Sequence, residues 1–214
     1  MEENTITKIE AQKKKKDRVN VYIDNEYSFS CNTELIYIHG LKKGKVVDLD
    51  YLQDIIEEDN YLYAKSRALS FIEKTFKTEK EIRVKLREKE FNEKIIERVI
   101  EFLRKYDFVD DSRYAELYIK ERINKQGKVK IKYGLIKKGI NDSIIDEKLS
   151  KYSANNENYI EAMREVALKK FNNIAKRETD KLKIKRKLSS YLLGRGYSWS
   201  EIGEVLKEIF SENN

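Results

Sequence analysis

The chain has 214 residues, of which 39% are charged and 40% hydrophobic, and its formal net charge is +7 at pH 7. Its single cysteine, Cys31, excludes an internal disulfide and a cysteine metal cluster, and the absence of proline fits a mostly helical chain. No apolar run approaches the roughly 18 residues needed to span a bilayer or forms a signal-peptide core, so we expect a cytoplasmic protein without membrane contact.

The first residues of the chain predict β-structure. Val19–Asp24 and Tyr27–Cys31 alternate apolar and polar residues, and the Asp-Asn-Glu sequence between them is typical of a tight turn. We therefore expect a β-hairpin, to which Thr5–Ile9 adds a third strand, since a lone hairpin is marginally stable. A short helix near Thr33–Ile38 is expected to end at Gly40.

An acidic stretch follows the predicted hairpin. Residues 48–60, DLDYLQDIIEEDN, carry six acidic residues and no basic one, which gives a net charge of −6. We interpret this stretch as a solvated helix. The remaining chain has the periodicity of helices, and the first helix of that part is expected near Tyr61–Phe76.

Three similar stretches interrupt the helical pattern: LREKEFNEKII at 86–96, LIKKGINDSII at 135–145 and LLGRGYSWSEI at 192–202. Each places an apolar residue directly before a helix N-cap and an isoleucine four residues after that cap, which is the arrangement of a hydrophobic staple. These positions are Phe91, Asn92 and Ile96; Ile140, Asn141 and Ile145; and Tyr197, Ser198 and Ile202. Gly139 and Gly196 suit a left-handed helix end, and Glu90 takes that position in the first stretch at a cost of about 1 kcal/mol.

The spacing of these corners predicts tandem repeats. It is 49 residues from Phe91 to Ile140 and 57 residues from Ile140 to Tyr197, and the longer interval requires an extended first helix or a loop around residues 172–183. Each repeat is expected to hold three helices, with the capping box Thr78-x-x-Glu81 opening the second helix of the first repeat. The predicted fold is mainly α, with three tandem three-helix repeats in an elongated array after a small β-hairpin-containing segment. The predicted boundaries are 1–59 for that segment and 60–106, 107–152 and 153–214 for the repeats.

Two glycine motifs resemble nucleotide sites but lack essential parts. Gly40-Leu-Lys-Lys-Gly-Lys45 is one residue short between its glycines, and Val46 stands where a phosphate-binding loop has a metal-binding Ser or Thr. Gly194-Arg-Gly196 lacks the third glycine and the preceding strand of a dinucleotide site. We interpret the first motif as a turn between elements.

Acidic residues and the single histidine also have structural explanations. Asp107, Asp110 and Asp111 precede a helical pattern, so they are better explained as capping residues than as metal ligands. His39 beside Gly40 is interpreted as a helix C-terminal residue, which leaves no histidine for a catalytic pair. We therefore expect no enzyme activity, no metal and no cofactor.

Basic residues gather in three places. Residues 121–140 hold seven basic residues and one acidic, residues 164–187 hold ten basic and three acidic, and Lys13–Lys16 with Arg18 form a third cluster. Solvated helix faces explain such stretches as well as a surface for phosphates or for an acidic protein groove does. The candidate partner-binding residues are Arg122, Lys125, Lys128, Lys130, Lys132, Lys137, Lys138, Lys183, Lys185 and Arg186.

The helical part resembles the RecX family. The matching pieces are Arg67-Ala-Leu69, Glu81-Ile-Arg-Val-Lys-Leu86, Phe108-Val-Asp-Asp111 with Tyr114-Ala115, Lys137-Lys-Gly-Ile140 and, more loosely, Gly194-Arg-Gly-Tyr197. The resemblance covers roughly residues 60–210, and these motifs are specific together but not singly. Residues 1–60 resemble an extra segment of longer family members. Glu90 and the longer third interval depart from the family pattern.

The resemblance implies three tandem three-helix modules in an elongated, curved molecule. It also implies a non-enzymatic, monomeric regulator that lies in the groove of the RecA recombinase filament on single-stranded DNA and restrains ATP hydrolysis and strand exchange, in DNA repair and the SOS response. The alternative is a protein that binds nucleic acid directly without a recombinase. A nuclease would need a carboxylate cluster, for which the stretch at 48–59 is the sole candidate.

Overall fold

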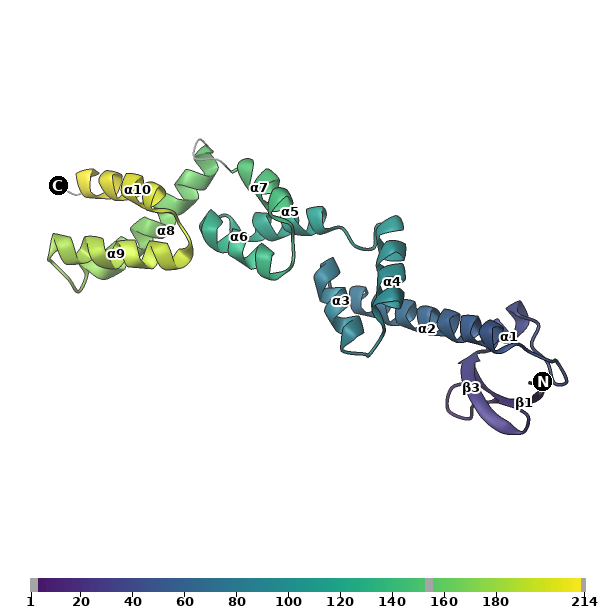
Figure 1. Ribbon diagram of the computed structural model, residues 1–214. Coiled ribbons are helices and arrows are strands. Elements are labelled where there is room, and N and C mark those ends of the chain that lie inside the picture. Colours follow the sequence, from purple (N-terminus) through teal and green to yellow (C-terminus); the bar gives the residue numbers. More distant parts are fainter. Residues whose placement is uncertain (1–3, 153–155, 213–214) are drawn as a thin grey trace. The chain divides into compact units, whose positions relative to one another are not determined.

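The computed structural model describes residues 4–152 and 156–212. Its N-terminal part is a three-stranded antiparallel sheet of β1 (Ile6–Ala11), β2 (Arg18–Ile23) and β3 (Glu26–Asn32), in that order (Figure 1). Asp24 and Asn25 turn the hairpin with φ of 50° and 72°, values that asparagine and aspartate tolerate best among non-glycine residues. The predicted hairpin and third strand are confirmed.

One long helix covers the sheet. After α1 (Thr33–Ile38), which begins at the Asn32 cap, α2 runs from Leu49 to Ile72. The prediction that this helix begins near Tyr61 is wrong. Leu52 and Ile55, inside the acidic stretch, are buried against residues of the sheet, and this packing stabilises the earlier turns of the same helix. The helix therefore runs through the expected boundary between residues 59 and 60 and ends before Phe76.

Asp59 is the exception to the solvated character of the acidic stretch. It is only 5% exposed, accepts two hydrogen bonds from the Arg18 guanidinium at 2.7 and 3.3 Å, and accepts another from the Asn32 backbone N–H at 2.8 Å. A buried carboxylate requires such partners. Arg18, which the sequence placed in a basic surface cluster, therefore ties the start of the central strand β2 to α2.

Two further helices complete the first three-helix module. They are α3 (Glu79–Arg87) and α4 (Glu93–Lys105), and α4 packs along α2. Between them Glu90 has φ of 63°, and the Asn92 side chain caps α4 by accepting from the Ile95 backbone N–H at 2.8 Å. The first corner thus has the predicted left-handed residue and cap.

The second and third modules share one hydrophobic core. The second module comprises α5 (Asp111–Arg122), α6 (Lys128–Lys137) and α7 (Asp142–Ser150); the third comprises α8 (Glu157–Ala175), α9 (Lys181–Arg195) and α10 (Trp199–Glu212). Ile140 and Tyr197 are 4% and 2% exposed, and Gly139 and Gly196 have φ of 84° and 88°. The predicted corners are confirmed, and the 19-residue α8 absorbs much of the longer third interval.

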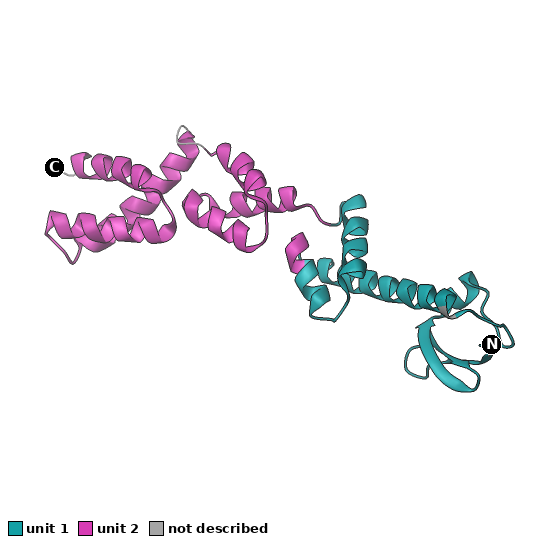
Figure 2. Ribbon diagram, viewed as in Figure 1, with its two compact units in different colours: residues 1–75, 82–108 teal, residues 76–81, 109–214 magenta. Residues whose placement is uncertain are grey.

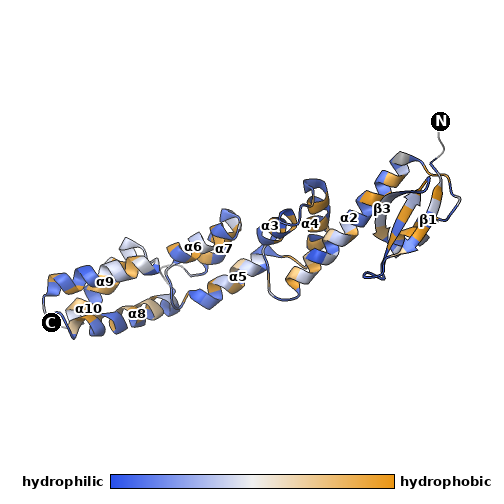
Figure 3. Cartoon of the chain, turned by 90° about the horizontal axis from the view of Figure 1, so that it is seen from below, coloured by the Kyte–Doolittle hydropathy of each residue, from blue (hydrophilic) through white to orange (hydrophobic). Residues whose placement is uncertain are grey.

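The described chain divides into two compact units. One comprises residues 1–75 and 82–108, and the other residues 76–81 and 109–214, so the start of α3 belongs with the second and third modules (Figure 2). Hydrophobic residues alternate with hydrophilic ones in the strands and recur among hydrophilic ones along the helices (Figure 3). In the described ranges no helix is long and apolar enough to cross a membrane.

Candidate functional site

The ten candidate residues all lie in the second unit, but they do not form one surface of equivalent cations. Arg122 ends α5 and Lys125 follows it; Lys128, Lys130, Lys132 and Lys137 lie on α6, Lys138 is its C-cap, and Lys183, Lys185 and Arg186 lie on α9. Their side chains differ in what they contact. Some hold neighbouring modules together, and others have no acidic partner.

The first turn of α6 is joined end to end to the last turn of α9. The Gly127 backbone N–H donates to the Arg195 carbonyl at 3.0 Å, and the Val129 N–H donates to the Gly196 carbonyl at 3.1 Å. Helix starts have unpaired N–H groups and helix ends have unpaired carbonyls, so each end satisfies the other. The opposed partial charges of the two helix ends also attract.

Glycine is required on both sides of this joint. A Cβ on Gly127 would lie 2.1 Å from the Gly196 carbonyl oxygen, and a Cβ on Gly196 would lie 2.3 Å from the Lys130 Cβ. Gly196 also needs its left-handed φ of 88° to end α9. One residue thus both ends a helix and admits the neighbouring module.

Two candidate lysines belong to this joint. Lys130 Nζ donates to the Gly194 carbonyl at 3.2 Å, while Lys128 Nζ lies 3.8 Å from a Glu201 carboxylate oxygen and 4.6 Å from the centre of the Tyr159 ring. Burial raises the pKa of both nearby phenols, Tyr159 and Tyr197, the latter to about 12. These lysines therefore connect the second module to the third.

A second joint links the start of α3 to the corner after α6. Thr78 Oγ1 donates to the Lys138 carbonyl at 2.8 Å, Lys80 Nζ donates to the Lys137 carbonyl at 3.3 Å, and Lys138 Nζ pairs with the Glu81 carboxylate. A Cβ on Gly139 would lie 2.5 Å from the Lys80 Cβ. The same kind of joint therefore recurs one module earlier.

The ion pair in this second joint shifts both of its groups. Burial opposes ionisation of Glu81, but hydrogen bonds from Lys138 and from the Thr78 backbone outweigh it, so the pKa of Glu81 is lowered. The hydrogen bond to Glu81 raises the pKa of Lys138. Both shifts favour the charged pair at neutral pH.

Two more candidates are paired inside the second module. Lys132 lies 2.6 Å from Asp146, whose hydrogen bond raises the pKa of the lysine, and Arg122 lies 2.7 Å from Glu121. Arg122 also stacks on the Tyr118 ring, 3.9 Å from its centre. The exposed positions of these pairs make each a weak contributor to stability.

The remaining candidates are available to a partner. Lys125, Lys137, Lys185 and Arg186 are exposed and have no salt bridge within residues 4–152 and 156–212; Lys183 is 4.0 Å from Asp180. Lys137 Nζ lies over the Tyr133 ring, 4.6 Å from its centre. These cations lie on α6, on α9 and after α5, and the first joint holds the start of α6 against the end of α9.

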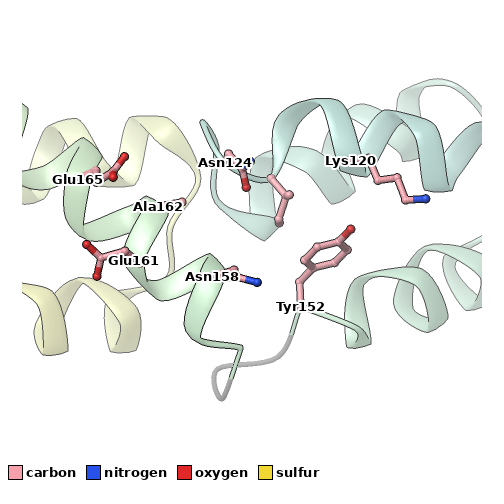
Figure 4. A pocket seen from close by; sticks show the side chains of 8 residues that line it. Lys120, Asn124, Tyr152, Asn158, Glu161, Ala162 and Glu165 are labelled. Carbon is pink, nitrogen blue, oxygen red and sulfur yellow. The ribbon is translucent and has the colours of Figure 1, made fainter.

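A pocket between α5 and α8 offers no catalytic arrangement. It has a volume of about 530 Å³, and Figure 4 shows Lys120, Tyr152, Glu161 and Glu165 among the side chains around it. Lys120 is already paired with Glu116 at 2.6 Å. In the part of the chain that the structure describes, no group of three His, Cys, Asp or Glu side chains is arranged to hold a metal ion.

Of the three aspartates predicted to cap the helix, only Asp110 does so: Asp107 has φ of 54°, and the Asp111 carboxylate accepts from the Glu79 backbone N–H at 3.0 Å. The Asp110 side chain caps α5 by accepting from the Arg113 backbone N–H at 2.9 Å, and His39 is the C-cap of α1. Gly40 and Gly44 have φ of 53° and 83° in turns. The functional residues missed in the sequence are Gly127, Thr78 and Lys80, whose roles depend on partners 57 to 69 positions away.

Comparison with known proteins accounts for most of the chain. Residues 4–48 match the regulatory protein RecX N-terminal domain, and residues 64–103, 110–149 and 157–206 match the first, second and third three-helix domains of RecX. The chain is 48% identical to a "Regulatory protein RecX" of Clostridium tetani, over 96% of this chain and 94% of that protein. The chain belongs to the RecX family.

Further RecX proteins support the assignment. A relative from Clostridium perfringens is 44% identical over 95% of both chains. A solved structure titled "Crystal structure of regulatory protein RecX" superposes with a TM-score of 0.73 at 30% identity and covers 95% of this chain and 99% of that one. RecX from Lactobacillus salivarius gives 0.65 at 28% identity, covering 71% of this chain and 97% of that one. RecX proteins are non-enzymatic regulators, so this chain is a regulatory protein and not an enzyme.

Proposed function

We propose that this RecX-family chain binds the filament that RecA forms on single-stranded DNA. Bound in the filament groove, it restrains ATP hydrolysis, strand exchange and filament growth, and it acts as a monomer in the cytoplasm. The observation that carries the proposal is the match to RecX domains along nearly the whole chain. The matched relatives are named regulatory proteins. A regulator made of tandem helical modules requires a contact surface for its partner and no catalytic residues.

Exposed cations of the second unit support the proposal. Lys125, Lys137, Lys185 and Arg186 have no acidic partner among the described residues, and the joint between α6 and α9 fixes the line along which they are spaced. A filament repeats the same groups along its groove, so several weak contacts can form at once. Each exposed contact contributes about 0.2–1 kcal/mol, and their sum is sensitive to salt.

Lys128, Lys130 and Lys138 have a different part in this proposal. Their ammonium groups are engaged by Glu201, the Gly194 carbonyl and Glu81, respectively. Replacing them would disturb the joints and the surface together. A test of partner binding should therefore leave them unchanged.

The decisive experiment compares two triple variants in a titration of RecA ATPase activity on single-stranded DNA. The first, Lys137→Gln with Lys185→Gln and Arg186→Gln, removes unpaired cations from α6 and α9. The control, Lys169→Gln with Lys176→Gln and Lys207→Gln, removes the same charge from exposed positions on or next to α8 and α10. We expect several-fold weaker inhibition, and a flatter salt dependence, for the first variant only.

Two outcomes would count against the proposal. If the first variant and the control inhibit identically at low and high salt, the contact surface lies elsewhere. If the wild-type chain fails to sediment with RecA filaments but sediments with bare single strands, the chain is a direct nucleic-acid-binding protein and needs no recombinase.

A further inference from the structure

The second unit carries a row of three aromatic side chains, of which Tyr114 and Tyr118 pack against its core while Phe76 does not. The ring centres of Phe76 and Tyr114 are 6.4 Å apart with the planes inclined by 25°, and those of Tyr114 and Tyr118 are 6.2 Å apart and inclined by 24°. A guanidinium lies at each end, that of Arg113 at 5.7 Å from the Phe76 centre and that of Arg122 at 3.9 Å from the Tyr118 centre. The three rings and two arginines are called the aromatic row below.

On the side away from the core, the aromatic row borders an open pocket. The pocket has a volume of about 290 Å³ and is lined by the three rings with Leu117, Glu121, Arg122 and Lys138. Phe76 and Leu117 are 46% and 48% exposed, a high fraction for side chains of this size. Large exposed apolar groups gathered beside cations mark a binding surface more often than a structural contact.

The far end of the row is held in place by a neighbouring helix. Gly134 lies within α6, and a Cβ there would lie 2.2 Å from the Tyr118 hydroxyl oxygen. Glycine destabilises a helix interior relative to alanine, so its presence here makes room for this ring. The Tyr118 ring is therefore fixed by packing before any ligand arrives.

We infer that the aromatic row is a stacking platform for the bases of single-stranded nucleic acid. Near-parallel, partly exposed rings accept unpaired bases of any sequence, and the Arg113 guanidinium beside Phe76 meets a phosphate, whereas Arg122 is paired with Glu121. Arg113 has no salt bridge in the described ranges, and the charge of Glu121 is compensated by Arg122 at 2.7 Å. Duplex bases are stacked on each other and do not present free faces, so the platform selects single strands.

This inference goes beyond the proposed filament contact, because base stacking on the row requires no recombinase. It also involves different residues from the unpaired cations of α6 and α9. Each of the two can therefore fail without the other, and they are measured in separate assays.

The test uses a fluorescently labelled oligothymidylate, an abasic oligonucleotide of the same length and a duplex, each titrated with full-length protein. The variants are Phe76→Leu and Tyr114→Leu, which remove a ring but keep an apolar side chain. The matched control is Tyr133→Leu, a 59% exposed tyrosine on α6 outside the row. Removing one stacking ring should weaken oligothymidylate binding by at least about fivefold, while the control and all abasic-strand affinities stay unchanged.

A photochemical cross-linking measurement on the wild-type protein tests the inference without relying on variants that could fold poorly. An oligonucleotide carrying bromodeoxyuridine should cross-link to Phe76, Tyr114 or Tyr118, as mapped by mass spectrometry. The inference is overturned if wild type binds the abasic strand as tightly as oligothymidylate, if the row variants bind like Tyr133→Leu, or if cross-links map only to other residues. If the row variants lose RecA inhibition but bind oligothymidylate like wild type, the row contacts the filament protein and the stacking inference is overturned, while the filament proposal stands.

Discussion

Replacing Gly127 with alanine isolates the joint between α6 and α9. Gly127 has φ of −71°, which alanine adopts without strain, so on backbone grounds the substitution should stabilise the protein by about 0.4–1 kcal/mol. The added Cβ would however lie 2.1 Å from the Gly196 carbonyl oxygen, which is main chain and has no flexible end to move. The joint must open for the methyl group to fit.

Opening the joint breaks two backbone hydrogen bonds, from Gly127 to Arg195 and from Val129 to Gly196. Their net loss is about 1 kcal/mol each, and more where a buried group is left without water. After subtracting the favourable backbone effect, we expect the free energy of unfolding to fall by about 1–3 kcal/mol. The backbone conformation alone thus predicts that Gly127→Ala stabilises the protein, whereas the contact with Gly196 predicts that it destabilises it.

Urea denaturation followed by circular dichroism measures the change, with Gly203→Ala as the control. Gly203 lies inside α10 with open space around its Cβ position, so alanine there should raise stability by about 0.5–1 kcal/mol through helix propensity. If Gly127→Ala is as stable as wild type or rises with Gly203→Ala, the end-to-end joint does not form as described.

Three further predictions follow from the corners and the second joint. Ile140→Asp should lower the free energy of unfolding by about 2–4 kcal/mol in the same urea assay, because a 4% exposed aliphatic group of the staple is replaced by a charge; an unchanged midpoint would contradict this. Glu90→Gly should raise stability by up to about 1 kcal/mol by relieving the left-handed φ of 63°, and a decrease would show that the corner is not strained. Because its folded pKa is lowered, Glu81 contributes stability above its unfolded pKa that is lost as pH falls through the folded pKa, so Glu81→Gln should flatten the acid limb of a pH–stability curve; parallel curves for the two proteins would refute this.

The corners were predictable because their signals are local. A staple residue, a cap and a glycine within a few positions of each other state where one helix ends and the next begins, and Ile140, Asn141 and Gly139 all take those roles. The start of α2 was not predictable, because the many acidic residues around Leu52 and Ile55 hid the pattern of buried positions. The spacing of apolar residues is weak evidence for the start of a helix that packs against a sheet from another part of the chain.

The division of labour among the lysines also escaped the sequence. Lys130 and Lys137 look alike as members of a basic helix, yet one donates to a carbonyl 64 positions away and the other lies over a ring on its own helix. Only the tertiary contacts tell a structural cation from a free one. The sequence alone therefore could not separate the lysines that hold modules together from those without an ion pair among the described residues.

The left-handed residue at each corner differs between the first module and the two that follow it. Gly139 and Gly196 each receive the second helix of the preceding module, whereas Glu90 keeps only the left-handed turn and has an exposed side chain. A side chain is tolerated at a corner only where no module arrives from upstream. In this chain, the non-glycine corner therefore lies in the first module, and each glycine corner lies in a module that packs against the one before it. An engineered extension at the front of the array would first need Glu90 changed to glycine.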